Sequence, residues 1–311
     1  MTSYGIVGTG ALGGFYGARL QQAGMEVHFL LRSDYAHVKQ SGLTIISADG
    51  NFTLPEVNAY NSVQDMPACD VVILALKTTQ NYLLPQLLPP LIKENTVVLV
   101  LQNGLGVEEQ VAAIVGDERV IGGLCFICAN KIGAGHIHHL DYKAIVLGEY
   151  APQYHAQGIS PRMEQIRQDF AQADIPLELT EDLLLARWRK LVWNIPYNGL
   201  SVVLDATTAE MMASPETVIL IRKIMEEVAA IAAGSHRLIS PSYVDKMLNH
   251  TAKMKPYRTS MKIDYDEYRP LEIESIFLNP LRSAQAVGVE LSLIPMLYQQ
   301  LKFLDTRNSS L

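Results

Sequence analysis

Cysteine is scarce in this chain, which excludes a fold held together by disulfide bonds. The 311 residues include only three cysteines, Cys69, Cys125 and Cys128, too few for a disulfide framework. Cys125 and Cys128 form a C-x-x-C pair, a spacing that suits a redox pair or half of a zinc site. No second pair completes a zinc site, and residues 122–129 around them are typical of a strand. We interpret both as small strand residues, with a redox pair as the alternative.

Basic charge and long apolar runs are scarce as well. The 25 lysines and arginines are outnumbered by 32 acidic residues, which gives a formal net charge of -7. This balance disfavours nucleic acid as a partner, because phosphate binding needs a basic face. No apolar run is long enough to span a bilayer, and the N-terminus lacks the basic stretch and apolar core of a signal peptide. We therefore expect a cytoplasmic protein without membrane partners.

Hydrophobic residues, by contrast, are plentiful. They make up 49% of the chain against 18% charged residues, a composition that buries large cores and argues against disorder. A chain of 311 residues is too long for one ordinary core, so we expect two domains.

The first half alternates short apolar runs with helical spacing. Strands are expected at residues 4–7, 27–31, 71–76, 96–101, 120–129, 136–140 and 144–147. Helices are expected at 11–23, 83–92 and 107–115, the second shortened or kinked by its prolines. This alternation predicts an α/β fold with a doubly wound parallel sheet.

In the second half of the chain, the spacing of apolar residues indicates helices only. Its predicted helices cover residues 183–192, 215–233, 243–253 and 273–287. We place the boundary near Thr180, so that residues 1–180 form a Rossmann-type domain and residues 181–311 an all-helical C-terminal domain. The apolar residues of 218–233 could pair between two subunits or fill the core. A homodimer is the expectation.

A glycine-rich loop follows the first predicted strand and opens the first predicted helix. In this G-x-G-x-x-G pattern, Gly8 permits the tight turn, Gly10 lets the backbone approach a pyrophosphate, and Gly13 allows close helix packing. The pyrophosphate would face unpaired N–H groups at the positive end of the helix dipole. We expect a dinucleotide bound by Gly8, Thr9, Gly10, Ala11, Leu12 and Gly13.

The end of the second strand bears on the choice between NAD and NADP. An acidic residue about 20 positions after the glycines would bind the ribose hydroxyls of NAD. This chain has Arg32 and Ser33 there, and the only acid nearby is the later Asp34. Arg32 and Ser33 can donate hydrogen bonds to a 2′-phosphate, so NADP(H) is the predicted cofactor. Arg32 as a solvated residue at the start of a helix is the alternative.

Two further residues stand at strand ends, where open α/β sheets bind their ligands. Lys77 follows strand 71–76 and can neutralise phosphate charge. Asn103 follows strand 96–101 and can hold the nicotinamide ribose or a substrate hydroxyl. Each could instead be a surface or capping residue.

The helical half carries a polar stripe among apolar residues. Lys190, Asn194 and Asn198 are spaced four apart, which stacks them on one helix face if the helix continues through Pro196. Burying such groups is costly without partners, so the stripe is either exposed or the wall of a site. Its apolar neighbours favour a site.

Taken in order, these motifs resemble the ketopantoate reductase (2-dehydropantoate 2-reductase) family along nearly the whole chain. The resemblance rests on the glycine loop, Leu76-Lys77-Thr78, Leu101-Gln102-Asn103-Gly104, Trp188-x-Lys190-Leu191-x-x-Asn194, Thr259-Ser260-Met261-x-x-Asp264 and Glu272-Ile273-Glu274. It implies an enzyme that uses NADPH to reduce a branched 2-oxo acid, 2-dehydropantoate, in pantothenate biosynthesis.

Residue roles follow from the same resemblance. It implies Lys190 as catalytic proton donor, Glu272 as a second catalytic residue, and Ser260 as a ligand of the substrate carboxylate or hydroxyl. It also implies that Asn103, Asn194 and Asn198 bind substrate, and that Arg32, Lys77, Asn103 and Ala129 contact the cofactor. From the sequence alone, Glu272 could also be an exposed carboxylate at a helix start.

Two departures leave the substrate open. Gly199-Leu200-Ser201 stands where the family commonly has proline after the asparagine, and residues 205–208 also depart from the usual continuation. Reduction of a different 2-oxo acid is therefore an alternative. A non-catalytic NADPH-binding sensor is a further alternative, which would not need Lys190.

Histidines are the last candidates for chemistry. His136 and His138 fall on one face of a predicted strand and His139 on the other, and no carboxylate or cysteine set joins them. We expect solvated strand histidines and hydride transfer without a metal.

Overall fold

The computed structural model describes residues 2–308, which form two compact units. The first unit contains the chain up to Gln102 together with Val107–Leu183, and the second contains Asn103–Gly106 and the chain from Leu184 onward. The strand and helix pattern of the sequence does not indicate that Asn103–Gly106 joins the helical half. Within residues 2–308, none of the helices combines the length and the apolar character that crossing a membrane requires.

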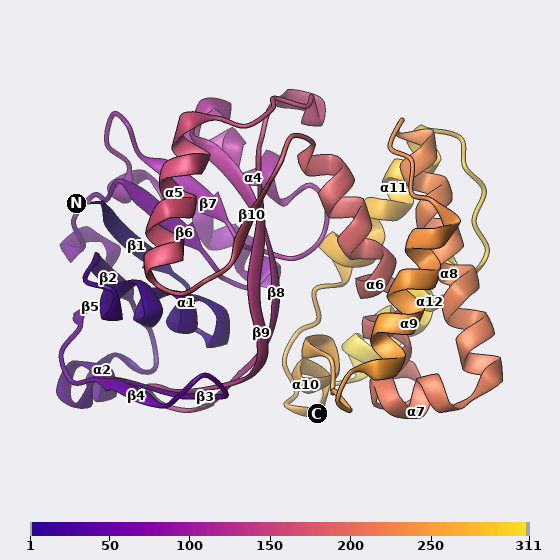
Figure 1. The fold of residues 1–311 in the computed structure, drawn as a ribbon, viewed down its shortest axis with the longest axis horizontal. Helices are drawn as coiled ribbons and strands as arrows, with labels where there is room; N and C mark the ends of the chain where they lie inside the picture. Colours follow the sequence, from indigo (N-terminus) through magenta and orange to yellow (C-terminus); the bar gives the residue numbers. More distant parts are fainter. Residues whose placement is uncertain (1, 309–311) are drawn as a thin grey trace. The chain divides into compact units, whose positions relative to one another are not determined.

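The first unit is built on one mixed sheet, half of which is a parallel, doubly wound sheet (Figure 1). Its parallel strands lie in the order β7 (Val97–Val100), β6 (Val71–Leu74), β1 (Ser3–Val7), β2 (Glu26–Leu30) and β5 (Asn58–Tyr60). The chain runs outward from β1 to β2 and β5, then returns to β6 on the other side of β1. The strand order therefore reverses between β1 and β6. The predicted Rossmann-type fold is confirmed.

The other half of the sheet is formed around a long antiparallel hairpin of β8 (Val120–Gly133) and β9 (His136–Glu149), which curves visibly in Figure 1. The remaining strands are β3 (Leu43–Ser47), β4 (Phe52–Leu54) and β10 (Leu177–Thr180). β3 and β10 pair with β9, and β4 pairs with β3. The prediction of separate strands at 136–140 and 144–147 is wrong, because the pairing with β8 makes them one strand.

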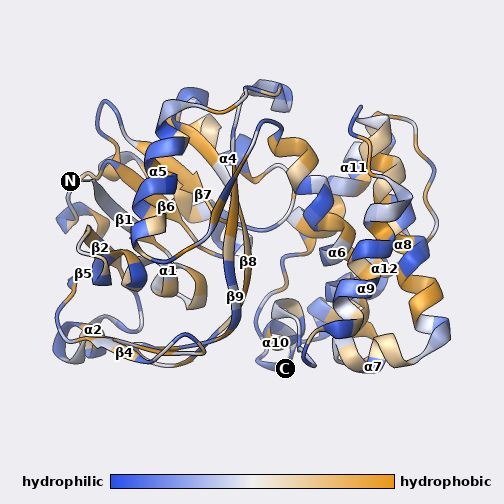
Figure 2. Cartoon of the chain, viewed as in Figure 1, coloured by the Kyte–Doolittle hydropathy of each residue, from blue (hydrophilic) through white to orange (hydrophobic). Residues whose placement is uncertain are grey.

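Helices pack around the parallel strands, of which β1, β6 and β7 are almost entirely buried. They are α1 (Ala11–Gln22), α2 (Tyr35–Ser41), α3 (Leu84–Leu87), α4 (Val107–Val115) and α5 (Pro161–Gln172). The predicted helix 83–92 is reduced to α3 and two 3₁₀ turns, because its prolines remove helical N–H donors. Figure 2 shows the hydrophobic residues concentrated along β6 and β7.

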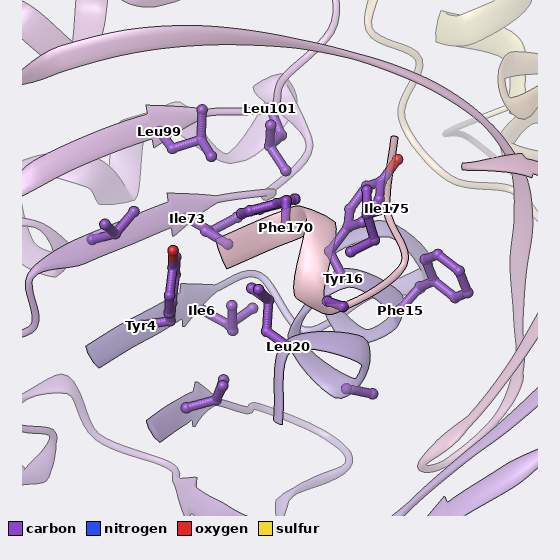
Figure 3. Packing of buried hydrophobic residues seen from close by; sticks show 14 of the residues in the cluster. Tyr4, Ile6, Phe15, Tyr16, Leu20, Ile73, Leu99, Leu101, Phe170 and Ile175 are labelled. Carbon is purple, nitrogen blue, oxygen red and sulfur yellow. The ribbon is translucent and has the colours of Figure 1, made fainter. Parts of the chain in front are cut away.

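The core of this unit joins α1 and α5 to the sheet (Figure 3). The ring of Phe170 from α5 lies 6.2 Å from that of Tyr4 in β1 and 6.4 Å from that of Tyr16 in α1. The buried hydroxyl of Tyr4 donates a 2.7 Å hydrogen bond to Asp169, which satisfies both polar groups in the apolar interior.

His139 corrects the expectation of solvated histidines. Its side chain is 2% exposed, its Nδ1 lies 2.8 Å from the hydroxyl of Ser47, and its Nε2 bonds the carbonyl of Tyr142. Pairing of β3 with β9 places Ser47 beside His139, and the ring of Phe15 from α1 packs 4.4 Å from the imidazole, so this face of the strand is covered by a helix. Cys125 and Cys128 are buried residues of β8, as expected for small strand residues.

The second unit is helical. Its elements are α6 (Leu183–Val203), α7 (Thr208–Ala213), α8 (Pro215–Gly234), α9 (Pro241–Lys253), α10 (Ser260–Asp266), a π-helical segment (Glu274–Leu278), α11 (Asn279–Ala286) and α12 (Leu293–Asn308). The predicted helix 183–192 is too short, because α6 continues through Pro196 to Val203. Buried Ile221, Ile224, Val228 and Ile231 place the apolar face of α8 in the core of this unit.

Candidate active site

The glycine loop lies at the point where the strand order reverses, between β1 and β6. Gly8 has a φ of +101°, and a Cβ there would come within 2.5 Å of the backbone nitrogen of Leu76. A Cβ on Gly13 would lie 2.3 Å from the carbonyl oxygen of Gly8. Only glycine therefore fits either position. Around Gly10, by contrast, no heavy atom of the described residues lies within 4 Å of a Cβ, apart from atoms of Gly10 and its two chain neighbours.

This open space in front of Gly10 suits an anionic group. Gly10 is the N-cap of α1, and as a glycine it has no side chain that could cap that helix end. The first N–H groups of the helix therefore point toward the space that Gly10 leaves clear. Thr9 uses its hydroxyl to donate a 2.9 Å hydrogen bond to the carbonyl of Leu30, which fixes the loop to the end of β2. The loop fits a dinucleotide pyrophosphate.

Two charged residues that follow β2 differ in their surroundings, since Arg32 is exposed whereas Asp34 is buried and hydrogen-bonded. Asp34 is 6% exposed, and its carboxylate accepts hydrogen bonds from Lys131 at 2.5 Å and from the backbone N–H of Gly135 at 3.1 Å. Burial alone would raise the pKa of Asp34, but these bonds hold it below its ordinary value. The carboxylate is thus hydrogen-bonded to β8 and to the turn after it. Arg32, two residues earlier, is exposed.

Of the other two residues predicted at strand ends in the first unit, Lys77 lies just beyond its strand and Ala129 lies inside its strand. Lys77 follows β6 and precedes a 3₁₀ turn, where it is half-buried. Gln102 holds this edge together, since its side-chain nitrogen donates to the carbonyl of Leu76 at 2.9 Å and to Asn81 at 2.7 Å. Ala129 was expected at a strand end, but β8 continues to Gly133 and Ala129 stands at an irregularity inside it.

In the second unit, Lys190 and Asn103 meet. The ammonium of Lys190 donates a 2.7 Å hydrogen bond to the side-chain oxygen of Asn103. Lys190 is half-buried on α6, whereas Asn103 belongs to the four-residue segment that packs with the helices.

The segment that carries Asn103 is held by the π-helical turn. Gly104 has a φ of +99°, and a Cβ on it would lie 2.5 Å from the backbone of Ser275. The N–H of Leu105 donates a 2.8 Å hydrogen bond to the carbonyl of Ser275, and the amide of Asn279 donates 2.7 Å to the carbonyl of Leu105. The π-helical segment therefore supplies the carbonyl group that anchors Leu105. Such π-helical turns often occur at functional sites.

The polar stripe continues along α6. Because the helix runs unbroken through Pro196, Lys190, Asn194 and Asn198 lie on one face, over about 12 Å at 1.5 Å per residue. Asn194 is 6% exposed and Asn198 is 4% exposed. Among residues 2–308, no hydrogen-bond partner reaches the buried side-chain oxygen of Asn198. A buried acceptor of this kind is costly unless a ligand or a water molecule supplies the donor.

The two remaining predicted residues lie at the start of α10 and just before the π-helical segment. Ser260 is the first residue of α10 and is half-buried, with Thr259 as its N-cap. Glu272 is 5% exposed and stands three residues before Ser275, next to the π-helical segment. The alternative that Glu272 is an exposed helix-start carboxylate is therefore wrong.

Comparison with known proteins identifies this arrangement. Residues 4–152 match the family model described as ketopantoate reductase PanE/ApbA, and residues 182–305 match the model of its C-terminal domain. The chain belongs to the ketopantoate reductase family. The resemblance inferred from the order of the motifs is confirmed.

Relatives within the ketopantoate reductase family cover nearly the whole chain. A 2-dehydropantoate 2-reductase from Nostoc sp. is 64% identical over 305 residues, which span 98% of this chain and 96% of the relative. A solved 2-dehydropantoate 2-reductase from Geobacter metallireducens has a TM-score of 0.92 and 42% identity, with 97% of this chain and 99% of that chain covered. The corresponding structure from Methylococcus capsulatus has a TM-score of 0.88 and 33% identity, with 99% and 98% covered.

The sequence departure beside the asparagines has a physical reason in this member of the ketopantoate reductase family. A Cβ on Gly199 would lie 2.5 Å from the side chain of Leu297. Gly199 thus lets α12 pack directly against the α6 backbone, next to Asn198. Leu297 is 2% exposed, so the position is part of the core of the second unit.

Proposed function

We propose that this protein reduces the 2-oxo group of 2-dehydropantoate to give pantoate, with NADPH as the hydride donor. The observation that carries the proposal is the 2.7 Å bond between Lys190 and Asn103, at one end of a stripe of buried amides. The glycine loop of the first unit would hold the cofactor. Lys190 and the amides of the second unit would hold the keto acid.

The chemistry requires one hydride and one proton. NADPH, when bound, supplies the hydride that adds to the carbonyl carbon and leaves negative charge on the carbonyl oxygen. The ammonium of Lys190 stabilises that charge and gives its proton to the oxygen, which completes the hydroxyl group. The resulting amine then takes up a proton from solvent. Glu272, buried in the same unit, would keep Lys190 oriented and charged.

The amides explain why this particular keto acid fits. 2-Dehydropantoate carries a hydroxyl group beyond its 2-oxo group, and the side-chain oxygen of Asn198 is a buried acceptor that needs a donor. Asn194 and Ser260 would bind the rest of the substrate, with Ser260 on the carboxylate. A site built to bind a hydroxyl group rejects an analogue without it, since its own polar groups are then left unpaired.

The preference for NADP rests on the end of β2. Asp34, the acid nearest to the position that binds the ribose in NAD proteins, is engaged by Lys131 and Gly135. Arg32 is exposed and would bind the 2′-phosphate, with Lys77 on the same side, whereas the hydroxyl of Ser33 donates to Asp34 at 3.0 Å.

The test is an assay of the purified protein with 2-dehydropantoate and with the same 2-oxo acid lacking the hydroxyl group, each with NADPH and NADH. Loss of NADPH absorbance should be fastest with 2-dehydropantoate, by at least about 100-fold over the analogue. Preference for the analogue or for another 2-oxo acid would overturn the substrate. NADPH binding without turnover of any 2-oxo acid would show a sensor and overturn the enzyme.

A further inference from the structure

A pair of buried hydroxyl groups joins the two parts of the site that would hold the substrate. Ser201 lies on α6 less than one turn after Asn198, and Thr259 directly precedes Ser260. Both Ser201 and Thr259 are 0% exposed. Their hydroxyl oxygens lie 2.7 Å apart, although 58 residues separate them in the chain.

Counting hydrogens fixes the direction of these bonds. The hydroxyl of Ser201 donates to the carbonyl oxygen of Asn198 at 3.0 Å, which uses its one hydrogen. Thr259 must therefore donate to Ser201. The oxygen of Thr259 in turn accepts the backbone N–H of Lys262 at 3.2 Å, as an N-cap does. The chain of donors runs from α10, through Thr259 and Ser201, to the backbone of Asn198.

We propose that Ser201 and Thr259 are positioning residues that set the spacing between Asn198 and Ser260, and hence the length of keto acid that the site accepts. The inference rests on the proposed function in that Asn198 and Ser260 are taken to bind the substrate. The relay holds the carbonyl of Asn198, so it fixes the turn from which the unpartnered side-chain oxygen of that residue projects. At its other end it holds the residue before Ser260.

A second contact holds α10 to the end of α6 independently of Ser201 and Thr259, so the role of these two residues in positioning can be tested without unfolding the protein. Lys262 of α10 is 3% exposed, and its ammonium lies 2.6 Å from Asp205, which follows α6. Its ammonium also pairs with Asp266. Removing the hydroxyl of Ser201 therefore leaves α10 tied to the end of α6, and we expect a shift in geometry rather than unfolding.

The experiment compares Ser201→Ala with Ser201→Thr, which keeps the hydroxyl group, and with Ser235→Ala as control. Ser235 also donates its hydroxyl to a helix carbonyl, that of Ile231 at 3.2 Å, but on α8. Each protein is assayed with 2-dehydropantoate and with the 2-oxo acid lacking the hydroxyl group, alongside NADPH affinity and melting temperature. Ser201→Cys, which fills the site with a weak donor, covers the case of poor folding of the alanine variant.

Ser201→Ala and Ser201→Cys should raise KM for 2-dehydropantoate about tenfold with a smaller change in kcat, as expected for one lost buried hydrogen bond. The KM for the analogue and the affinity for NADPH should hardly change, and Ser201→Thr should restore the KM. Equal changes for both acids, or a KM in the folded Ser201 variants no higher than in Ser235→Ala, would overturn the inference.

The unmodified protein in the same panel tests the proposed function separately. If it prefers another 2-oxo acid, the substrate proposal fails. The KM of the Ser201 variants for that acid, compared with the KM of the unmodified protein, then decides the role of Ser201: a raised KM supports it and an unchanged KM overturns it. If it reduces no 2-oxo acid, both proposals fall.

Discussion

The ammonium of Lys190 donates a 2.7 Å hydrogen bond to the side-chain oxygen of Asn103, from which it is 87 residues distant in the chain. The bond engages the side-chain oxygen of the asparagine and so fixes the orientation of its amide group. It also holds the lysine at a fixed place on the polar stripe of α6. The proposed proton donor and the proposed ligand-binding amide are thus positioned by each other.

Replacing Lys190 with alanine tests the proton donor. We expect kcat to fall by about 10²- to 10⁴-fold, the usual contribution of a positioned general acid, while NADPH affinity stays close to that of the unmodified protein. Steady-state assays and fluorescence titration with NADPH measure the two effects. Lys246→Ala, which removes an exposed lysine from α9, should leave both unchanged. Normal turnover of Lys190→Ala would refute the mechanism.

Asn103→Asp tests whether Lys190 titrates during turnover. A carboxylate of the same shape beside the ammonium would raise the pKa of Lys190, because an opposite charge favours the charged form. The proton donor then stays protonated to higher pH. The alkaline limb of the kcat profile should therefore move to higher pH, with a lower plateau because the acid is weaker. An unchanged limb would assign it to a different group.

The glycine loop offers a pair of variants with opposite outcomes. Gly10→Ala places a methyl group in open space, so the melting temperature should not fall, but NADPH should bind at least about tenfold more weakly because the methyl group occupies the pyrophosphate position. Gly8→Ala meets the backbone of Leu76 at a φ of +101°, so it should lower the melting temperature itself. Unchanged NADPH affinity in Gly10→Ala would place the cofactor elsewhere.

Arg32→Ala tests the choice of cofactor. Loss of a charge-assisted bond to the 2′-phosphate should weaken NADPH by about 10- to 100-fold and leave NADH nearly unaffected. Titration calorimetry with both nucleotides gives the ratio. Arg167→Ala, which removes an exposed arginine paired with Glu164 on α5, is the matched control. Equal losses for NADPH and NADH would count against the phosphate contact.

Asp70 makes the stability of the first unit sensitive to acid. Lys93, at 2.7 Å, and the backbone N–H of Ser3, at 2.9 Å, lower the pKa of Asp70 from its ordinary value of 3.8 to about 2. The folded protein therefore binds this proton less readily than the unfolded chain does. The stabilisation is present above an ordinary carboxyl pKa and is lost as the pH falls toward about 2.

Thermal unfolding between about pH 4 and pH 2 measures this effect. The melting temperature of the unmodified protein should fall across that range, and Asp70→Asn should fall less steeply from a lower starting value. Parallel curves for the two proteins would show that Asp70 does not contribute.

Much of the fold could be predicted because local patterns coincide with tertiary burial. Strands such as β6 and β7 are buried on both faces, so they appear in the sequence as apolar runs. The short strands β3, β4 and β10 could not be predicted, since their residues are apolar only in part and their pairing depends on partners distant in the chain. α6 was predicted too short because Pro196 breaks an isolated helix, whereas tertiary packing buries and maintains it.

The sequence by itself determined the doubly wound half, the glycine loop and the family, because each depends on residues close together in the chain or on the order of motifs. Only the tertiary structure decided what surrounds those residues. It brought Asn103 to Lys190 through the turn at Gly104, engaged Asp34 with Lys131, and joined Ser201 to Thr259. These relationships depend on distances between residues far apart in the chain, which no local periodicity encodes.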